Sequence, residues 1–154
     1  MTAAKIDTIQ RKETSGPERL AMKYMLLIYI DKPLLDALPA GEFDTRMRQC
    51  LSHADELREE GKLLESQMLE EPSTAKSLRV RKGRQTIVDG PFAETKEVFA
   101  GLNVIEADSM DEAVRIASEF PWAKTGCIEV RPIRDIDSVR DRVGVARPAK
   151  SAVG

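Results

Sequence analysis

The sequence predicts an α+β fold in which two helices cover one face of a ferredoxin-like antiparallel sheet. Two observations predict this fold. Short apolar or alternating segments typical of strands are separated by two amphipathic segments of helical period, in the order strand, helix, strand, hairpin, strand, helix, strand. The chain of 154 residues, 42% hydrophobic and 32% charged, has the length and composition of one globular domain.

The first strand and the first helix come from the N-terminal part of that domain. Residues 23–30 form a continuous apolar run, as expected of a strand buried on both faces. Asp44 is placed to cap the following helix, and Gly61 ends it because glycine adopts the left-handed conformation without a Cβ clash. Apolar residues recur at steps of three and four along this helix, namely Met47, Cys50, Leu51, Ala54 and Leu57.

Three strand regions follow in the middle of the chain. Residues 63–69 place polar side chains on alternate positions, which is typical of a sheet with one hydrated face. Residues 77–89 alternate in the same way around the tight turn Lys82-Gly83 and are predicted to form a hairpin. Residues 98–107 form another strand region, which a glycine interrupts.

The second helix and the last strand complete the predicted fold. Ser109 and Glu112 have the spacing of a capping box, and Pro121 terminates the helix that they begin. Trp122, directly after that proline, is expected to anchor the core or an interface. Residues 126–132 contain alternating apolar and charged side chains, as in a strand with one exposed face.

The predicted domain spans residues 22–136. Residues 1–21 and 137–154 show no sustained apolar period, so both are expected to be flexible tails. Because both helices cover the same face of the sheet, the other face is left uncovered. A domain this small can bury that face against a second copy of itself, so we expect a two-fold homodimer.

Charge, hydropathy and motif content argue against several classes of function. The net charge is −2, without the basic excess of a nucleic-acid binder. The longest apolar run, residues 24–30, is far shorter than the roughly 20 residues that span a bilayer. It also lacks a secretory cleavage site, so we expect a cytoplasmic location. The chain has two isolated cysteines, one histidine, and no phosphate-binding glycine loop or nucleophile elbow, so we expect neither a metal nor a cofactor.

Residues 89–97, with the sequence DGPFAETKE, resemble the signature of the DGPF family of YCII-related proteins. Residues 23–29, 53–58 and 128–133 support this resemblance, which covers about three quarters of the chain and leaves out both tails. The resemblance implies a dimeric α+β barrel, in which the sheets of two subunits face each other and enclose clefts.

The resemblance also bears on function. The wider YCII group resembles enzymes because of a recurring histidine and aspartate, and a relative acts on chlorinated muconolactones. Many DGPF proteins have no assigned activity, and some are encoded beside extracytoplasmic-function sigma factors. This chain departs from the pattern twice. Ala100-Gly101-Leu102 replaces the usual Gly-Gly-Phe, and Cys50 lies where the wider group has its histidine, one helical turn before His53.

His53 and Asp89 are the candidate catalytic residues. His53 is the only histidine, it lies beside the apolar stripe of the first helix, and imidazole titrates near physiological pH. Asp89 precedes Gly-Pro and is the candidate carboxylate that orients the imidazole or acts as a base. Both residues have structural alternatives. His53 can be a half-exposed packing residue, and Asp89 can bind the backbone amides of its own turn.

Four further residues are candidate ligand-binding groups. Glu94, Thr95 and Lys96 place an acid, a hydroxyl and an amine in succession, where they can bind a polar or anionic ligand. Arg131, on the exposed face of the last strand, can hold a carboxylate through two hydrogen bonds. The structural alternatives are ordinary solvated charges in the loop and an ion pair between Arg131 and Glu129.

These features lead to two functional hypotheses. In the first, a cytoplasmic homodimer uses a small polar cleft near the DGPF segment for cofactor-free acid–base chemistry on a small organic acid or lactone. In the second, the domain is a non-catalytic module that senses a metabolite or regulates a partner such as a sigma factor. The sequence alone does not decide whether the protein is an enzyme.

Overall fold

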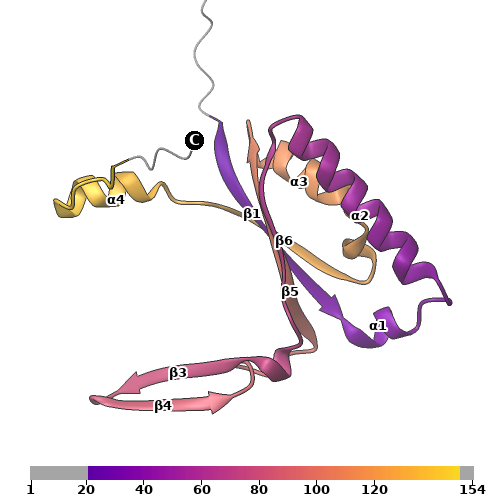
Figure 1. The fold of residues 1–154 in the computed structure, drawn as a ribbon, viewed down its shortest axis with the longest axis horizontal. Helices are drawn as coiled ribbons and strands as arrows, with labels where there is room; N and C mark the ends of the chain where they lie inside the picture. Colours follow the sequence, from indigo (N-terminus) through magenta and orange to yellow (C-terminus); the bar gives the residue numbers. More distant parts are fainter. Residues whose placement is uncertain (1–20, 150–154) are drawn as a thin grey trace, which may run out of the picture.

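The computed structural model of the protein describes residues 21–149 and has the predicted α+β architecture (Figure 1). A four-stranded antiparallel sheet has the strand order β2-β5-β1-β6, and β3 and β4 form a separate two-stranded ribbon. The elements are β1 (Met22–Asp31), α1 (Lys32–Asp36), α2 (Glu42–Glu59), β2 (Leu63–Met68), η1 (Pro72–Thr74), β3 (Lys76–Arg81), β4 (Arg84–Asp89), β5 (Glu97–Ala107), α3 (Met110–Ser118), η2 (Pro121–Lys124), β6 (Gly126–Pro132) and α4 (Ile136–Val143).

The hydrophobic core lies between one face of the sheet and helices α2 and α3 (Figure 1). Leu26 of β1 and Ile105 of β5 are fully buried, as are Ile116 of α3 and Phe120 after it. Burial of each such side chain contributes roughly 1.5–3 kcal/mol, which holds the two layers together. Leu51, which the sequence placed on the apolar stripe of α2, is instead exposed. Both main helices therefore cover one face of the sheet, as predicted.

The start of the helical layer differs from the sequence analysis. A short helix, α1, lies between the predicted first strand and first helix, where the Asp31 carboxylate caps it by accepting a hydrogen bond from the Leu34 N–H at 3.2 Å. Helix α2 begins at Glu42, directly after a left-handed Gly41, so Asp44 lies inside the first turn and does not cap the helix. In that turn its negative charge still favours the positive end of the helix dipole.

The second main helix follows the prediction. The Ser109 hydroxyl accepts a hydrogen bond from the Glu112 N–H at 3.1 Å, and the Glu112 carboxylate accepts one from the Asp108 N–H at 2.7 Å. Pro121 begins η2 after the helix has ended. Trp122 in η2 is buried and donates its indole N–H to Cys50 Sγ at 3.2 Å, so it anchors the core.

Strands β3 and β4 form the predicted hairpin. Lys82 and Gly83 both have positive φ, 50° and 71°, as the two-residue turn that matches the twist of paired strands requires. Figure 1 shows the hairpin extending from the end of the sheet on the side opposite to α2 and α3. Among the described residues, the hairpin therefore lies apart from the hydrophobic core.

The segment after β6 also differs from the sequence analysis, which expected a flexible tail. Ile136–Val143 form α4 because the Asp135 side chain caps the first turn and Gly144 ends the helix with φ 74°. Figure 1 shows α4 on the same side of the sheet as the hairpin. Residues 1–20 and 150–154, which make up the rest of the two predicted tails, lie outside the described residues.

The face of the sheet opposite the helices carries the alternate residues of each strand. Tyr24 and Leu26 of β1 belong to the core, so the residues between and after them point to this uncovered face. The central strands contribute half-buried, largely apolar side chains: Met25, Leu27, Tyr29, Phe99, Leu102 and Val104. The edge strands contribute polar side chains: Glu65, Gln67, Glu129 and Arg131. The uncovered face thus has an apolar centre between two polar margins.

Candidate functional site

An open cleft lies on the uncovered face, where β1 and β6 meet the end of the DGPF segment. Its volume is about 630 Å³. The residues that line it are Tyr29, Thr95, Lys96, Glu97, Cys127 and Glu129. Every one of these side chains carries a polar or ionisable group, and the charged ones are two carboxylates and one ammonium group. Thr95 and Lys96 are among the ligand-binding candidates from the sequence.

Tyr29 and Glu129 form the polar centre of the cleft. The Tyr29 hydroxyl donates a hydrogen bond to Glu129 Oε2 at 3.4 Å, across the paired strands β1 and β6. Phe99 packs against the Tyr29 ring with 5.5 Å between the ring centroids. The close approach of β6 depends on Gly126, because a Cβ at that position would lie 2.0 Å from the Tyr29 carbonyl oxygen.

The Tyr29 hydroxyl is a hydrogen-bond donor at neutral pH. Desolvation and then the negative charge of Glu129 raise the pKa of Tyr29 above its usual value of 10.0, and the positive charge of Arg131 partly opposes this shift. A phenol with a raised pKa stays protonated and can donate a hydrogen bond. Glu129 is the adjacent carboxylate that can accept one.

Lys96 places a positive charge at the mouth of the cleft. Its Nζ lies 3.7 Å from Oδ2 of Asp31, a buried carboxylate at the end of β1 that also caps α1. The Lys96 side chain is 84% exposed, so its ammonium group remains open to a ligand arriving from solvent. Thr95 beside it donates its hydroxyl to the Glu97 carbonyl oxygen, which shapes the chain as it enters β5.

Arg131 lies on the same face of the sheet, next to the residues that line the cleft. Its Nε is 3.8 Å from Glu129 Oε1, so the ion pair considered as the structural alternative is present. Both side chains are well exposed, and such a pair contributes only about 0–1 kcal/mol. The guanidinium group can therefore leave Glu129 and bind the carboxylate of a ligand with little loss of free energy.

His53 lies in the helical layer, on the other side of the sheet from the cleft. Its Nε2 is 3.3 Å from the Ile116 carbonyl oxygen and 3.5 Å from Glu119 Oε2. Its ring packs edge-on against Phe120, with 4.5 Å between the ring centroids. These are the contacts of a packing residue that connects α2 with α3 and with the residues between α3 and η2.

Asp89 ends β4 at the base of the hairpin, where its carboxylate lies 2.6 Å from Lys76 Nζ. The hairpin and α2 lie on opposite sides of the sheet (Figure 1), so one chain does not bring Asp89 to His53. The sequence left open whether these two residues meet, and within one subunit they lie apart. Glu94 belongs to the DGPF segment but is not among the residues that line the cleft.

Sequence reasoning missed Tyr29, Asp31 and Glu129 as residues of the site. Tyr29 belongs to an apolar run that predicted burial on both faces, whereas the structure leaves it half-buried on the uncovered face. Glu129 had been considered only as a partner of Arg131. Asp31 was not singled out in the sequence, since its burial depends on α1, which the sequence did not predict.

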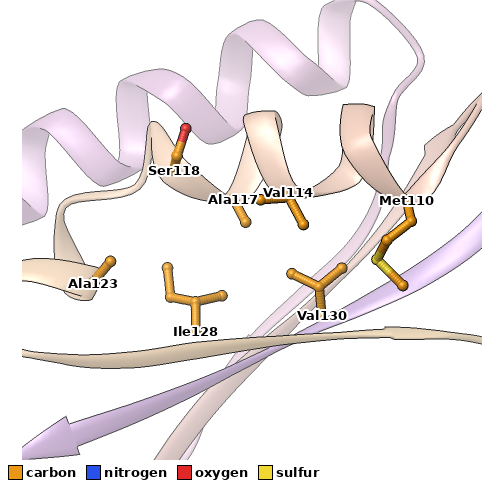
Figure 2. Close-up of a pocket in the computed structure, with 7 residues that line it drawn as sticks. All are labelled: Met110, Val114, Ala117, Ser118, Ala123, Ile128 and Val130. Atoms are coloured by element: carbon orange, nitrogen blue, oxygen red, sulfur yellow. The ribbon is translucent and has the colours of Figure 1, made fainter.

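A second depression, of about 370 Å³, lies between α3 and β6 on the helical side of the sheet (Figure 2). It is lined by Met110, Val114, Ala117, Ser118, Ala123, Ile128 and Val130. Only Ser118 has a polar side chain, and Figure 2 shows its hydroxyl pointing away from the groove. That hydroxyl donates a hydrogen bond to the Arg115 carbonyl oxygen at 2.6 Å. This apolar groove offers no group for acid–base chemistry.

Two further properties concern the part of the chain that the structure describes. Within residues 21–149, no three or more histidine, cysteine, aspartate or glutamate side chains are grouped as they would be around a metal ion. In the same range, no helix combines the length and the apolar character needed to cross a membrane. Glu129, which lines the cleft, contacts Tyr29 and Arg131, and Asp31 contacts the lining residue Lys96.

Comparison with known proteins identifies a matching family. The model of the YCII-related domain matches residues 22–137. The chain belongs to this family. An uncharacterised protein of Rhizobium meliloti (strain 1021) is 36% identical over 114 residues, which are 73% of this chain and 92% of that protein. The family is the one that the residues 89–97 predicted, and this relative carries no assigned activity.

Proposed function

We propose that this YCII-related protein binds a small organic acid or lactone in the cleft and moves a proton on it without a cofactor. The observation that carries the proposal is the grouping of Tyr29, Glu129 and Lys96 around one open cleft. A phenol that stays protonated, a carboxylate that can accept a proton and an ammonium group that can hold an anion are the groups that such a reaction needs.

In the proposed reaction, Lys96 and Arg131 hold the carboxylate of the ligand. Glu129 accepts a proton from the carbon next to the ligand's carbonyl group. The Tyr29 hydroxyl donates a hydrogen bond to the carbonyl oxygen, where negative charge develops. In an unsaturated ligand, Glu129 can return the proton to another carbon that is conjugated with the carbonyl group. The product is an isomer of the ligand, so the reaction needs no second reactant.

We also propose that two copies of the chain pair through the uncovered sheet face. The six half-buried side chains at its centre support this, because they form an apolar patch that a partner can remove from water. The polar margins resemble the rim of a protein interface. Pairing encloses the clefts and lowers the water content around Tyr29. We expect this dimer to act in the cytoplasm.

The test is an NMR titration of the ¹⁵N-labelled protein with carboxylated lactones and their ring-opened dicarboxylates, each also assayed for turnover. We expect amide shifts around Tyr29 and Lys96, and binding about tenfold weaker in Lys96→Met. Lys124→Met, at an exposed lysine of η2, is the matched control and should bind normally. Amide shifts confined to other surfaces would mean that the ligand does not bind in the cleft. Binding without turnover would favour the non-catalytic module, such as one that regulates a sigma factor.

A further inference from the structure

The β3–β4 hairpin is an amphipathic ribbon. Residues paired directly across the two strands point to the same face, which places Leu78 beside Ile87 and Val80 beside Gln85. The three aliphatic side chains on this face are exposed to 61%, 58% and 54% for Leu78, Ile87 and Val80. The opposite face carries Ser77, Arg79, Arg81, Arg84, Thr86 and Val88.

The opposite face forms hydrogen bonds with the DGPF segment, residues 89–97. The Ser77 hydroxyl donates a hydrogen bond to the Gly90 carbonyl oxygen at 2.8 Å, and Arg79 Nη2 donates one to the Phe92 carbonyl oxygen at 3.2 Å. The chain therefore holds one face of the hairpin and leaves the aliphatic face open among the described residues. A two-stranded ribbon alone is at best marginally stable in water, so a partner that packs on the exposed aliphatic face would stabilise it.

The charge of the hairpin differs in sign from that of the rest of the domain. Lys76–Asp89 hold five basic residues and one acidic residue, a net charge of +4. The other residues between 21 and 149 hold 14 basic and 22 acidic residues, a net charge of −8. A hairpin from one copy is thus attracted to the body of another copy, because the two carry opposite charge.

The area of the uncovered sheet face also favours a contact between two copies that extends beyond the sheet. Four strands about 4.8 Å apart, with about 3.3 Å per residue, give a footprint of roughly 500 Å². A stable interface buries about 800 Å² on each partner, so the sheet face alone is small for the purpose. The hairpin adds roughly 200 Å² on the same geometry. Figure 1 shows that it extends on the uncovered side, beside the place a second copy would occupy.

We propose that the hairpin is an arm that clasps a second copy of this chain, with Leu78, Val80 and Ile87 packed on the partner and the net positive charge of the ribbon attracted to the partner's negatively charged body. This inference rests on the dimer proposed above and adds to it a specific contact outside the sheet. Each subunit then holds its partner by the same DGPF-anchored ribbon, which couples the DGPF segment of one subunit to the body of the other.

The experiment is sedimentation velocity of the full chain over a concentration series, with two variants of the arm. Leu78→Thr/Ile87→Thr changes the aliphatic face, and Val88→Thr changes the opposite face of the same ribbon. Threonine is a β-branched residue that suits a strand, and Val88 is about as exposed as Ile87, at 53% against 58%. Circular dichroism and the fluorescence of Trp122, the only tryptophan, verify that the fold is intact.

We expect the wild-type chain of 17.2 kDa to dimerise. The dissociation constant should rise at least tenfold in Leu78→Thr/Ile87→Thr, change less than twofold in Val88→Thr, and rise with salt from 20 to 500 mM. An unchanged dissociation constant in the double variant overturns the arm and leaves the sheet-face dimer standing. A wild-type monomer at all concentrations overturns both. Salt-sensitive binding of a DNA duplex by that monomer, lost in Arg81→Glu/Arg84→Glu, would assign the ribbon to nucleic acid instead.

Discussion

The Tyr29 hydroxyl lies 3.4 Å from Oε2 of Glu129, although the two residues are 100 positions apart in the sequence. They meet because β1 and β6 are antiparallel neighbours, with Tyr29 paired to Cys127 and Leu27 paired to Glu129. This register places the phenol and the carboxylate on the same face of the sheet, diagonally across the two strands. The proposed acid–base chemistry depends on this pairing.

The first prediction concerns the Tyr29 hydroxyl. Tyr29→Phe keeps the ring beside Phe99 and removes only the donor, so the free energy of unfolding should change by about 0.5 kcal/mol or less. Turnover of a cleft ligand should fall by about 100-fold, because the developing negative charge loses its hydrogen bond. Urea denaturation and steady-state kinetics measure the two effects. Normal turnover in Tyr29→Phe would rule out the proposed role of this hydroxyl.

The second prediction concerns alkaline pH. Burial raises the pKa of the Cys50 thiol above 9.0, and desolvation and Glu129 raise the pKa of Tyr29 above 10.0. Both groups hold their protons more tightly in the folded chain than in the unfolded chain. Their contribution to stability is therefore complete below about pH 9 and is lost as the pH rises through the two folded-state pKa values. Urea denaturation between pH 7 and 11 should show this fall, reduced in Cys50→Ala and in Tyr29→Phe.

The third prediction separates the two cysteines. Cys50→Ala leaves the buried Trp122 indole N–H without its acceptor and creates a small cavity, so it should lower the free energy of unfolding by about 1–2 kcal/mol. Cys127→Ala, at an exposed position in the cleft, is the control and should change it by about 0.5 kcal/mol or less. A thiol reagent should modify Cys127 quickly and Cys50 only on unfolding. Equal reactivity of both thiols would contradict the burial of Cys50.

The fourth prediction concerns His53. His53→Ala removes the ring contact with Phe120 and the hydrogen bond to the Ile116 carbonyl, so it should destabilise the fold by about 1–3 kcal/mol. Ligand binding in the cleft should remain unchanged after correction for the folded fraction, because His53 lies on the other side of the sheet. A folded His53→Ala protein that binds ligand normally but has lost turnover would restore His53 as the acid–base residue.

The fifth prediction distinguishes two roles of Asp31. Asp31→Ala removes the cap of α1 and should lower the free energy of unfolding by about 1 kcal/mol. Asp31→Asn keeps a side-chain oxygen for the cap but removes the charge that faces Lys96, so it should cost less. The freed Lys96 should then bind anionic ligands a few-fold more tightly, as calorimetry would measure. Weaker anion binding in Asp31→Asn would mean that the carboxylate positions Lys96 instead of competing for it.

Local signals predicted several parts of this fold because each depends on a few consecutive residues. The capping pair Ser109 and Glu112 and the turn Lys82-Gly83 are formed as predicted. The helix α4 was not predicted, because a helix of only eight residues has a short apolar period and little stability of its own. The start of α2 was misplaced by a few residues because Gly41 adopts a left-handed conformation, and the sequence pattern favoured Asp44 as the cap.

The sequence by itself determined the family, the strand and helix order, and the position of Thr95 and Lys96 in the DGPF segment. Only the tertiary structure decided that Tyr29 and Glu129 join Lys96 around one cleft, that Asp31 contacts Lys96, and that His53 packs on the other side of the sheet. The physical reason is that strand order and register are set by burial of the whole apolar face against α2 and α3. That burial depends on segments that are far apart in the sequence. No run of neighbouring residues contains that information.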